Sequence, residues 1–486
     1  MNNKFKWPVY VLALGLSLSG CKNALDIEPQ QSIDAAAGYN TSQKVAAAVV
    51  GTYARLVDPR LYGTDLILVP ELMGGSGYIE WGGSFQNYRQ IRNNTQISNL
   101  SNAQGIWTQA YAAINQCNLV LANLAVVTDA GQRSQFEGEA LFIRGAMYFE
   151  LVRLFANQYQ PGGANTQPGV PINLIAITSV EQADIKLPRS TVQQVYDQVI
   201  KDLQDAMAKL PAQNITRASK YSAEAMLARV YLQQGNYPAA RIAANNVITN
   251  SGASLQGSVA AVFANRNSSE SLFEIQQNDQ NNAGTANDGL ATYFAGYSPN
   301  GDQGILYGRG DVEISGDFAD LYEPTDVRGT DSLAALTTQK LIYLSDGNNK
   351  TEQLRTLKWR TYGQNIPIIR LAEMYLIRAE ADVRANNPGQ ALLDINAIRT
   401  RSRATPLTTV TLADVLLERK LELAFEGFRI HDQKRNNEVV IAAVPPSADD
   451  PAGSPEVRAS DPRFVLPIPQ REINNNPNLT QNEFYL

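Results

Sequence analysis

Two segments of the chain combine many aromatic residues with glycine, asparagine and arginine. The first, residues 61–102, contains GGSGYIEWGGSFQNYRQ, and the second lies within residues 251–364. Flat aromatic rings can stack on the apolar C–H faces of a sugar ring, while amide and guanidinium groups can bond its hydroxyls. Chemistry of this kind would bind a saccharide without breaking any covalent bond.

The candidate ligand-binding residues are the aromatic side chains of these segments and their polar neighbours. They are Trp81, Tyr78, Phe85, Asn87, Tyr88, Arg89, Tyr293, Tyr297 and Tyr307. Nearby in the sequence are Tyr62, Phe294, Asn287 and Asp288. Because Gly82 and Gly83 follow Trp81 and add little bulk to cover it, we expect its indole to be exposed. The alternative is that the aromatic rings pack these loops onto a scaffold.

A second group of residues could perform acid–base chemistry or bind a metal ion. Glu418, Glu422 and Glu426 recur every four positions, which places them on one face of a helix. Basic residues are interleaved with them, so we interpret this face as solvent-exposed and ion-paired rather than catalytic. Glu373 and Glu380 lie beside arginines in the same way, and they could also neutralise arginines packed between helices.

The only histidine of the chain is His431, which excludes zinc sites built from several histidines. The sequence has neither the G-x-S-x-G motif of serine hydrolases nor a phosphate-binding glycine loop between a strand and a helix. We therefore predict no catalytic residue, no cofactor and no metal site. A glycosidase remains open, because two carboxylates suffice for that reaction. A calcium site in the Asp- and Asn-rich loops also remains open, although no EF-hand spacing is present.

The first 20 residues have the make-up of a secretory signal. Two lysines precede an apolar run over residues 7–18, and LSGC then ends at Cys21, which resembles the lipobox of bacterial lipoproteins. We predict a signal peptide over residues 1–20, lipid attachment at Cys21 and a lipidated tether over residues 21–33. A signal-anchor helix and an ordinary cleaved signal are the alternatives, but a spanning helix needs about 20 apolar residues.

The composition limits the remaining possibilities. The chain has 486 residues, a formal net charge of −6 and 44% hydrophobic residues, so it can bury a large core. We find no basic stripe that could neutralise phosphates, which argues against nucleic acid as a partner. No later stretch is apolar over about 18 residues, so we predict a lipid-anchored rather than a membrane-spanning protein. Cys117 is expected to be a small buried side chain.

Helical periodicity dominates the rest of the chain. Apolar residues recur at i, i+3, i+4 and i+7 in residues 42–56, 104–127, 132–157, 190–210, 222–250 and 366–403. The last two stretches each contain a break, at Gly235 and at Asn386–Gly389, and the first of them is close to the tetratricopeptide pattern. Capping boxes are expected at the starts of two helices, formed by Ser190 with Gln193 and by Thr411 with Asp414.

These patterns predict a mostly α fold with a few short strands. Tetratricopeptide-like helical hairpins would form a scaffold over residues of about 34–250 and 365–435. A large loop-rich insertion would occupy residues of about 251–364, where the composition shifts to Asn, Gly, Asp, Ser and Tyr. We treat residues 34–486 as a single domain.

Several motifs together resemble one known family. In chain order they are LSGC, WTQAYAAINQCN, RGAMYFELVRLF, GVPI, LPRSTVQQVYDQVIKDLQDA, LARVYLQQGNYPAA, PIIRLAEMYLIRAEA, LLERKLELAFEGFR and LPIPQREINNNPNLTQN. Each motif is weak alone. Their shared order, over essentially the whole chain, resembles the SusD/RagB-like surface lipoproteins of Bacteroidota-type bacteria.

The resemblance implies a tetratricopeptide-like scaffold with a ligand-binding face built from loops. It also implies a partner, a TonB-dependent (SusC-like) transporter of the outer membrane, to which the family delivers glycans or peptides. The ligand-binding aromatics of the family occupy no fixed motif, so no residue role is transferred. We predict a non-catalytic, surface-exposed lipoprotein of the outer membrane that captures oligosaccharide or polysaccharide. Peptide capture, a surface glycosidase and a pure scaffold are the alternatives.

Overall fold

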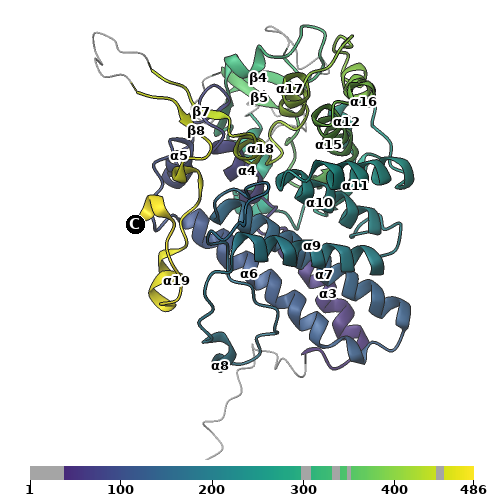
Figure 1. The fold of residues 1–486 in the computed structure, drawn as a ribbon, viewed down its shortest axis with the longest axis vertical. Helices are drawn as coiled ribbons and strands as arrows, with labels where there is room; N and C mark the ends of the chain where they lie inside the picture. The colour runs from purple at the N-terminus through teal and green to yellow at the C-terminus, as the bar shows by residue number, and fades with distance from the viewer. Residues whose placement is uncertain (1–37, 297–307, 331–339, 347–351, 445–453) are drawn as a thin grey trace, which may run out of the picture.

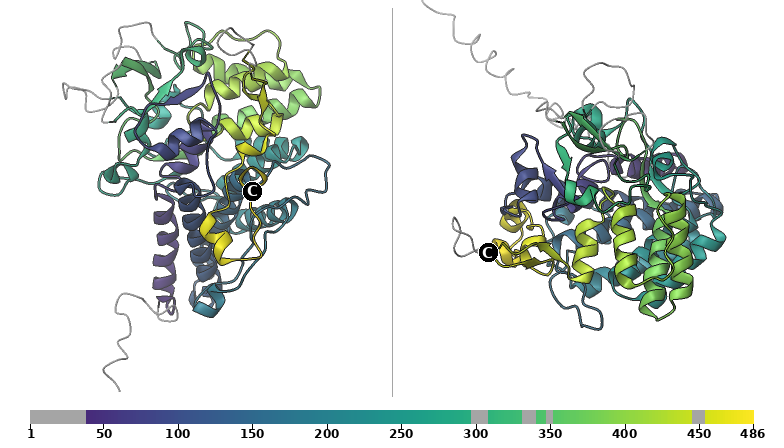
Figure 2. Two further views of the ribbon diagram at one scale, coloured as in Figure 1. Left: turned by 90° about the vertical axis from the view of Figure 1, so that its left-hand side faces the viewer. Right: turned by 90° about the horizontal axis from the view of Figure 1, so that it is seen from above.

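The computed structural model describes residues 38–296, 308–330, 340–346, 352–444 and 454–486. The predicted signal peptide, the tether with Cys21, Tyr297 and Tyr307 lie outside these residues. Helices α3 (Ser42–Leu56), α6 (Ser101–Ala122) and α7 (Ala130–Phe155) fill the lower end of the molecule in Figures 1 and 2, and strands β4 (Ile342–Asp346) and β5 (Glu352–Thr356) lie at the upper end. The predicted mostly α fold with a few short strands is confirmed.

The long helices form the scaffold, and each of them packs against the next. They are α3 (Ser42–Leu56), α6 (Ser101–Ala122), α7 (Ala130–Phe155), α9 (Val192–Lys209), α10 (Lys220–Gln233), α11 (Tyr237–Asn250), α15 (Leu371–Arg384), α16 (Pro388–Arg401) and α17 (Leu412–Glu422). The pairs α10–α11 and α15–α16 are the two predicted hairpins. Helix α11 packs directly on α15, so the hairpins form a continuous stack although the loop-rich segment separates them in the sequence.

Short helices and strands make up most of the remaining regular secondary structure. The helices are α4 (Asp65–Leu72), α5 (Gln86–Arg92), α8 (Val180–Ala183), α12 (Val259–Ala264), α13 (Leu290–Phe294), α14 (Gly316–Ala319), α18 (Arg429–Asn436) and α19 (Gln470–Asn475). The strands are β1 (Ile79–Trp81), β2 (Ser271–Ile275), β3 (Val312–Ile314), β4 (Ile342–Asp346), β5 (Glu352–Thr356), β6 (Ile366–Arg370), β7 (Val439–Ile441) and β8 (Val457–Arg458).

One sheet joins the two aromatic-rich segments. Its strand order is β1-β3-β5-β4, and all three pairings are antiparallel. Strand β1 belongs to the first segment and β3 to the second, with Trp81 opposite Val312. This long-range pairing, which the sequence did not predict, fixes the two segments side by side.

The ends of the scaffold helices follow from local chemistry. Helix α17 begins with the predicted capping box, because Thr411 accepts from the Asp414 N–H and Asp414 accepts from the Thr411 N–H. The predicted box of α9 was wrong by one residue, since Thr191 and Gln194 form it. Gly235 turns the α10–α11 hairpin with a φ of +71°, a conformation that costs little only for glycine.

The segment Ile366–Arg370 corrects the start of the helical hairpin predicted over residues 366–403. It forms strand β6, which pairs with β2, and helix α15 begins only at Leu371. All five residues of β6 are buried. Its isoleucines also fit a helical period, but here they form a buried strand. Pro367 favours the same outcome, because a proline disfavours the α conformation in the residue before it, here Ile366.

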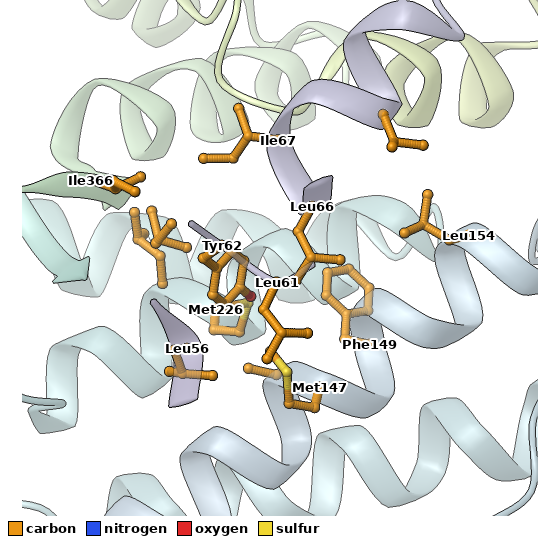
Figure 3. Packing of buried hydrophobic residues seen from close by; sticks show 14 of the residues in the cluster. Leu56, Leu61, Tyr62, Leu66, Ile67, Met147, Phe149, Leu154, Met226 and Ile366 are labelled. Atoms are coloured by element: carbon orange, nitrogen blue, oxygen red, sulfur yellow. The ribbon is translucent and has the colours of Figure 1, made fainter. Parts of the chain in front are cut away.

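The main hydrophobic core lies between the scaffold helices and the short elements above them. Figure 3 shows Leu61, Tyr62, Met147, Phe149 and Met226 packed together, with Leu56, Leu66, Ile67, Leu154 and Ile366 around them. Cys117 is fully buried, as expected for a small apolar side chain. Within the described parts of the chain, every helix is too short or too polar to cross a membrane.

The glutamates of α17 are ion-paired as predicted, but the prediction that they face solvent was wrong. Glu418 and Glu422 are 1% and 0% exposed, and Glu426, which follows the end of α17, is 9% exposed. Arg328 donates to Glu418 at 2.6 Å and to Glu422 at 3.0 Å. We call the following six residues the buried charge network: Glu270, Arg328, Arg370, Arg401, Glu418 and Glu422. It joins the loop-rich segment to β6, α16 and α17.

Further buried ion pairs connect the scaffold helices. Arg229 on α10 donates to both carboxylate oxygens of Glu373 on α15, at 2.8 and 2.7 Å. Glu380 on α15 is fully buried and pairs with Arg435 on α18. Because Glu373 and Glu380 are both 0% exposed, the interpretation that they face solvent was wrong, and the alternative that they neutralise arginines packed between helices is confirmed.

Candidate functional site

Four of the predicted ligand-binding residues come together in space. Trp81 ends β1, Phe85 and Tyr88 belong to the start of α5, and Tyr293 belongs to α13. The ring centroid of Trp81 lies 4.6 Å from that of Tyr88 and 5.3 Å from that of Tyr293. Phe85 lies 6.4 Å from both tyrosines. We call Trp81, Phe85, Tyr88 and Tyr293 the aromatic cluster.

Trp81 lies inside this cluster rather than on its surface. Its exposed fraction is only 6%, so the expectation of an exposed indole was wrong. The glycines that follow it explain the difference: a Cβ at residue 83 would lie 2.8 Å from the Trp81 ring and 2.7 Å from Asp311. Gly83 therefore lets the backbone close tightly over the indole, where any larger residue would collide with it.

Replacing Gly83 with alanine tests this close packing. We expect the free energy of unfolding to fall by about 1–3 kcal/mol, because the new methyl group must displace Trp81 or Asp311. Chemical denaturation of the purified protein measures the effect. Gly257→Ala is the matched control, because a Cβ there meets no atom within 4 Å. Equal stability of the two variants would show that residue 83 is not tightly packed.

Carboxylate partners hold the two tyrosines of the cluster in place. The Tyr88 hydroxyl donates to Asp65 Oδ1 at 2.7 Å, and the Tyr293 hydroxyl donates to Asp288 Oδ1 at 2.7 Å. Asp65 also accepts from Asn102 and Arg60. Burial raises the pKa of Asp65, although these donors act in the opposite direction. Both phenol groups are thus engaged within the protein and orient their rings.

An arginine that the sequence did not single out covers part of the cluster. The Arg309 guanidinium lies 5.0 Å from the centroid of Phe85 and 5.2 Å from that of Tyr293. Asp311 accepts from it at 2.9 and 2.6 Å, which fixes its plane. Its place just before β3 brings it here, because β3 pairs with β1. The run GRGD, which follows Tyr307, is the signal in the sequence that could have identified Arg309.

The surface of the cluster is formed by Phe85 and polar side chains. Phe85 is 39% exposed, and Arg89, which follows it on α5, is also exposed. Arg89 uses one N–H to hold the Gly83 carbonyl at 2.7 Å. Asn87 is half-buried and donates to Asn102, so it supports the cluster from the side. An exposed ring with guanidinium and amide groups around it can stack on a flat apolar face and bond nearby hydroxyls.

Other aromatics of the two segments lie in the core instead. Tyr78 is 2% exposed, stacks on Phe425 at 5.7 Å and donates to Glu71. Glu71 in turn accepts backbone N–H groups that include Gly427 at 2.7 Å. Tyr62 and Phe294 are also buried. We therefore retain neither Tyr78 nor these two as ligand-contacting residues.

The geometry offers little for acid–base or metal chemistry. The acidic residues at the cluster, Asp65, Asp288 and Asp311, each accept hydrogen bonds from arginine or tyrosine side chains. In the described part of the chain, no group of three or more His, Cys, Asp and Glu residues could hold a metal ion. His431 is 1% exposed, and burial holds its pKa well below the usual value.

Two family models match the chain. Residues 25–232 match a model described as "Starch-binding associating with outer membrane", and residues 336–485 match the SusD family model.

Individual proteins extend the similarity over the full length. The SusD-like protein P2 of Formosa agariphila is 27% identical, with 98% of this chain and 99% of that protein aligned. The starch-binding protein SusD of Bacteroides thetaiotaomicron is 34% identical, over 28% of this chain and 26% of its own. A crystal structure of a SusD superfamily protein from the same species has a TM-score of 0.74 and 26% identity, covering 91% of this chain and 99% of that one.

Proposed function

This chain belongs to the SusD/RagB family, and we propose that it captures oligosaccharides at the aromatic cluster and delivers them to a TonB-dependent transporter. The family consists of non-catalytic glycan-binding proteins, so the chain acts by binding rather than by cleavage. This classification removes the glycosidase alternative. The starch-binding descriptions of the family model and of one relative make glucans the first ligands to test.

The observation that carries the proposal is the exposed Phe85 ring on a fixed aromatic base. Trp81, Tyr88 and Tyr293 are buried and hold Phe85 from below, while Arg309 and Arg89 supply donors beside it. A base that is already ordered loses little conformational entropy when a ligand binds. One exposed ring and a few hydrogen bonds give modest affinity, so we expect dissociation constants in the micromolar range or weaker.

The proposal includes a lipid anchor at Cys21. Acylation of this cysteine after removal of residues 1–20 would tie the protein to the outer membrane, in agreement with the family description. The polar tether would leave the folded part free to meet both the glycan and the transporter. The transporter is proposed from the family resemblance.

Isothermal titration calorimetry against a panel of ligands tests the binding activity. The panel contains malto-oligosaccharides, other oligosaccharides with neutral and acidic units, and a set of short peptides. We expect at least one glycan to bind with a dissociation constant of about 1 μM or weaker, and no peptide to bind.

The same titrations can overturn the proposal. Binding of peptides without binding of any glycan would assign the protein to peptide capture. Failure of every ligand would favour a pure scaffold. Incubation of the bound glycan with the protein, followed by an assay for reducing ends, provides the control for cleavage, and we expect no new reducing ends.

A further inference from the structure

A pocket lies apart from the aromatic cluster and shares no residue with it. Its volume is about 370 Å³, within the usual range for small-molecule sites. Three connecting segments and strand β2 form it: the loop after α9, the residues after α11 and the turn before β2. The side chains that matter for its chemistry are Gln213, Asn214, Arg217, Tyr221, Ser269 and Glu274.

Hydrogen bonds between these segments fix the walls of the pocket. Gln213 donates to the Ser251 carbonyl at 2.7 Å, which ties the loop after α9 to the end of α11. Glu274 accepts from the Asn267 N–H and from the Asn365 side chain, both at 2.8 Å. The pocket is therefore built by contacts across four segments and does not depend on one flexible loop.

Several polar groups on the walls keep unused hydrogen-bonding capacity. The side chains of Asn214 and Tyr221 are half-buried, and neither has a hydrogen-bond partner among the described residues. Arg217 is about one-third exposed and uses Nη1 to donate to Glu139 at 3.1 Å. An amide, a phenol and the remaining guanidinium N–H groups can thus donate to or accept from a ligand.

The charges of the pocket favour a neutral ligand. The lining contains one basic and one acidic side chain, Arg217 and Glu274, so its formal charge is zero. Arg217 is paired with Glu139, and Glu274 accepts two amide hydrogen bonds at Oε2, while its buried Oε1 has no partner among the described residues. Apolar surface is present as well, because Ile215 is 80% exposed and Leu272 lines the wall. Hydroxyl and amide groups together with a few apolar side chains fit a polyhydroxylated ring.

We propose that this pocket is a second saccharide site, which takes a neutral mono- or disaccharide independently of the aromatic cluster. Asn214 and Arg217 hold hydroxyls of the sugar, and Tyr221 and Ile215 contact its C–H faces. The proposal does not rest on the proposed role of the aromatic cluster, because the two sites share neither residues nor hydrogen bonds. With both sites, one molecule could hold two units of a glycan or a glycan and a free sugar.

Saturation-transfer difference NMR tests the pocket with five named probes: glucose, galactose, N-acetylglucosamine, maltose and lactose. The full mature protein carries Phe85→Ala, so that the aromatic cluster contributes little. We expect at least one probe to bind. Asn214→Ala should weaken that binding about three- to tenfold through the lost hydrogen bond. Ala212→Trp, at an exposed lining residue, should abolish the signal by filling the pocket.

Ala47→Trp is the matched control for added bulk, because Ala47 is exposed on α3 and does not line the pocket. We expect it to leave the signal unchanged. The proposal is overturned if no probe gives a signal, or if Asn214→Ala and Ala212→Trp both leave every signal unchanged. If Phe85→Ala alone abolishes glycan binding, the glycan binds at the aromatic cluster, and if Ala212→Trp alone abolishes it, the glycan binds in this pocket. A failure of one proposed site can therefore be distinguished from a failure of the other.

Discussion

Replacing Glu422 with glutamine is expected to lower the free energy of unfolding by about 3–5 kcal/mol. Glu422 is fully buried and accepts from Arg328 at 3.0 Å, and it also pairs with Arg370 and Arg401. Glutamine keeps the shape but removes the negative charge, so three buried guanidinium groups lose a common partner. Chemical denaturation at neutral pH measures the loss.

The same residue predicts how stability depends on pH. Burial alone would raise the pKa of Glu422, but the charges of Arg401, Arg370 and Arg328 outweigh it and hold the pKa well below the usual value. Its contribution is therefore present above the unfolded-state pKa of about 4.3 and is lost as the pH falls below that value. Unfolding measured from pH 7 to pH 3 should show a smaller loss in Glu422→Gln than in the native protein.

An exposed ion pair provides the control for Glu422. Glu456 lies 2.8 Å from Arg458, and both side chains are 48% exposed. Because solvent screens such a pair, Glu456→Gln should change the free energy of unfolding by no more than about 0.5 kcal/mol. If the two variants lose the same stability, the buried charge network does not hold the loop-rich segment to the scaffold.

Replacing Phe85 with alanine is expected to weaken glycan binding roughly five- to thirtyfold, or about 1–2 kcal/mol. Phe85 is the exposed ring of the aromatic cluster, and its loss removes the stacking surface while the buried rings beneath it remain. The fold should be unaffected, because the side chain is already 39% exposed. Calorimetric titration with the glycan that binds best measures the change.

The matched control is Phe484→Ala. Phe484 is also 39% exposed, but it lies near the C-terminus and is not part of the cluster. We expect it to bind glycan as the native protein does. Unchanged affinity in Phe85→Ala would remove Phe85 from the site, and equal losses in both variants would indicate a general effect of removing exposed rings.

The scaffold could be predicted from the sequence because its signals are local. Helical periodicity, the turn at Gly235 and the capping box of Thr411 with Asp414 act within a few residues of each other. Strand β6 was predicted as helix, because its five buried residues fit a helical period as well as a buried strand. Only the pairing with β2, about 90 residues earlier in the chain, decides between the two.

The candidate site was predicted in part. Trp81, Phe85, Tyr88 and Tyr293 were named from their aromatic character, and the structure brings them together. Their exposure could not be predicted, because it depends on how β1 pairs with β3 and how closely Gly83 approaches Trp81.

The most direct test of the account is a crystal structure of the protein with the glycan that binds best in the calorimetric panel. We predict a sugar ring stacked on Phe85, with hydroxyls hydrogen-bonded to Arg89, Arg309 or Asn287. A glycan bound elsewhere, with no atom in contact with Phe85 or either arginine, would contradict the assignment of the aromatic cluster as the capture site.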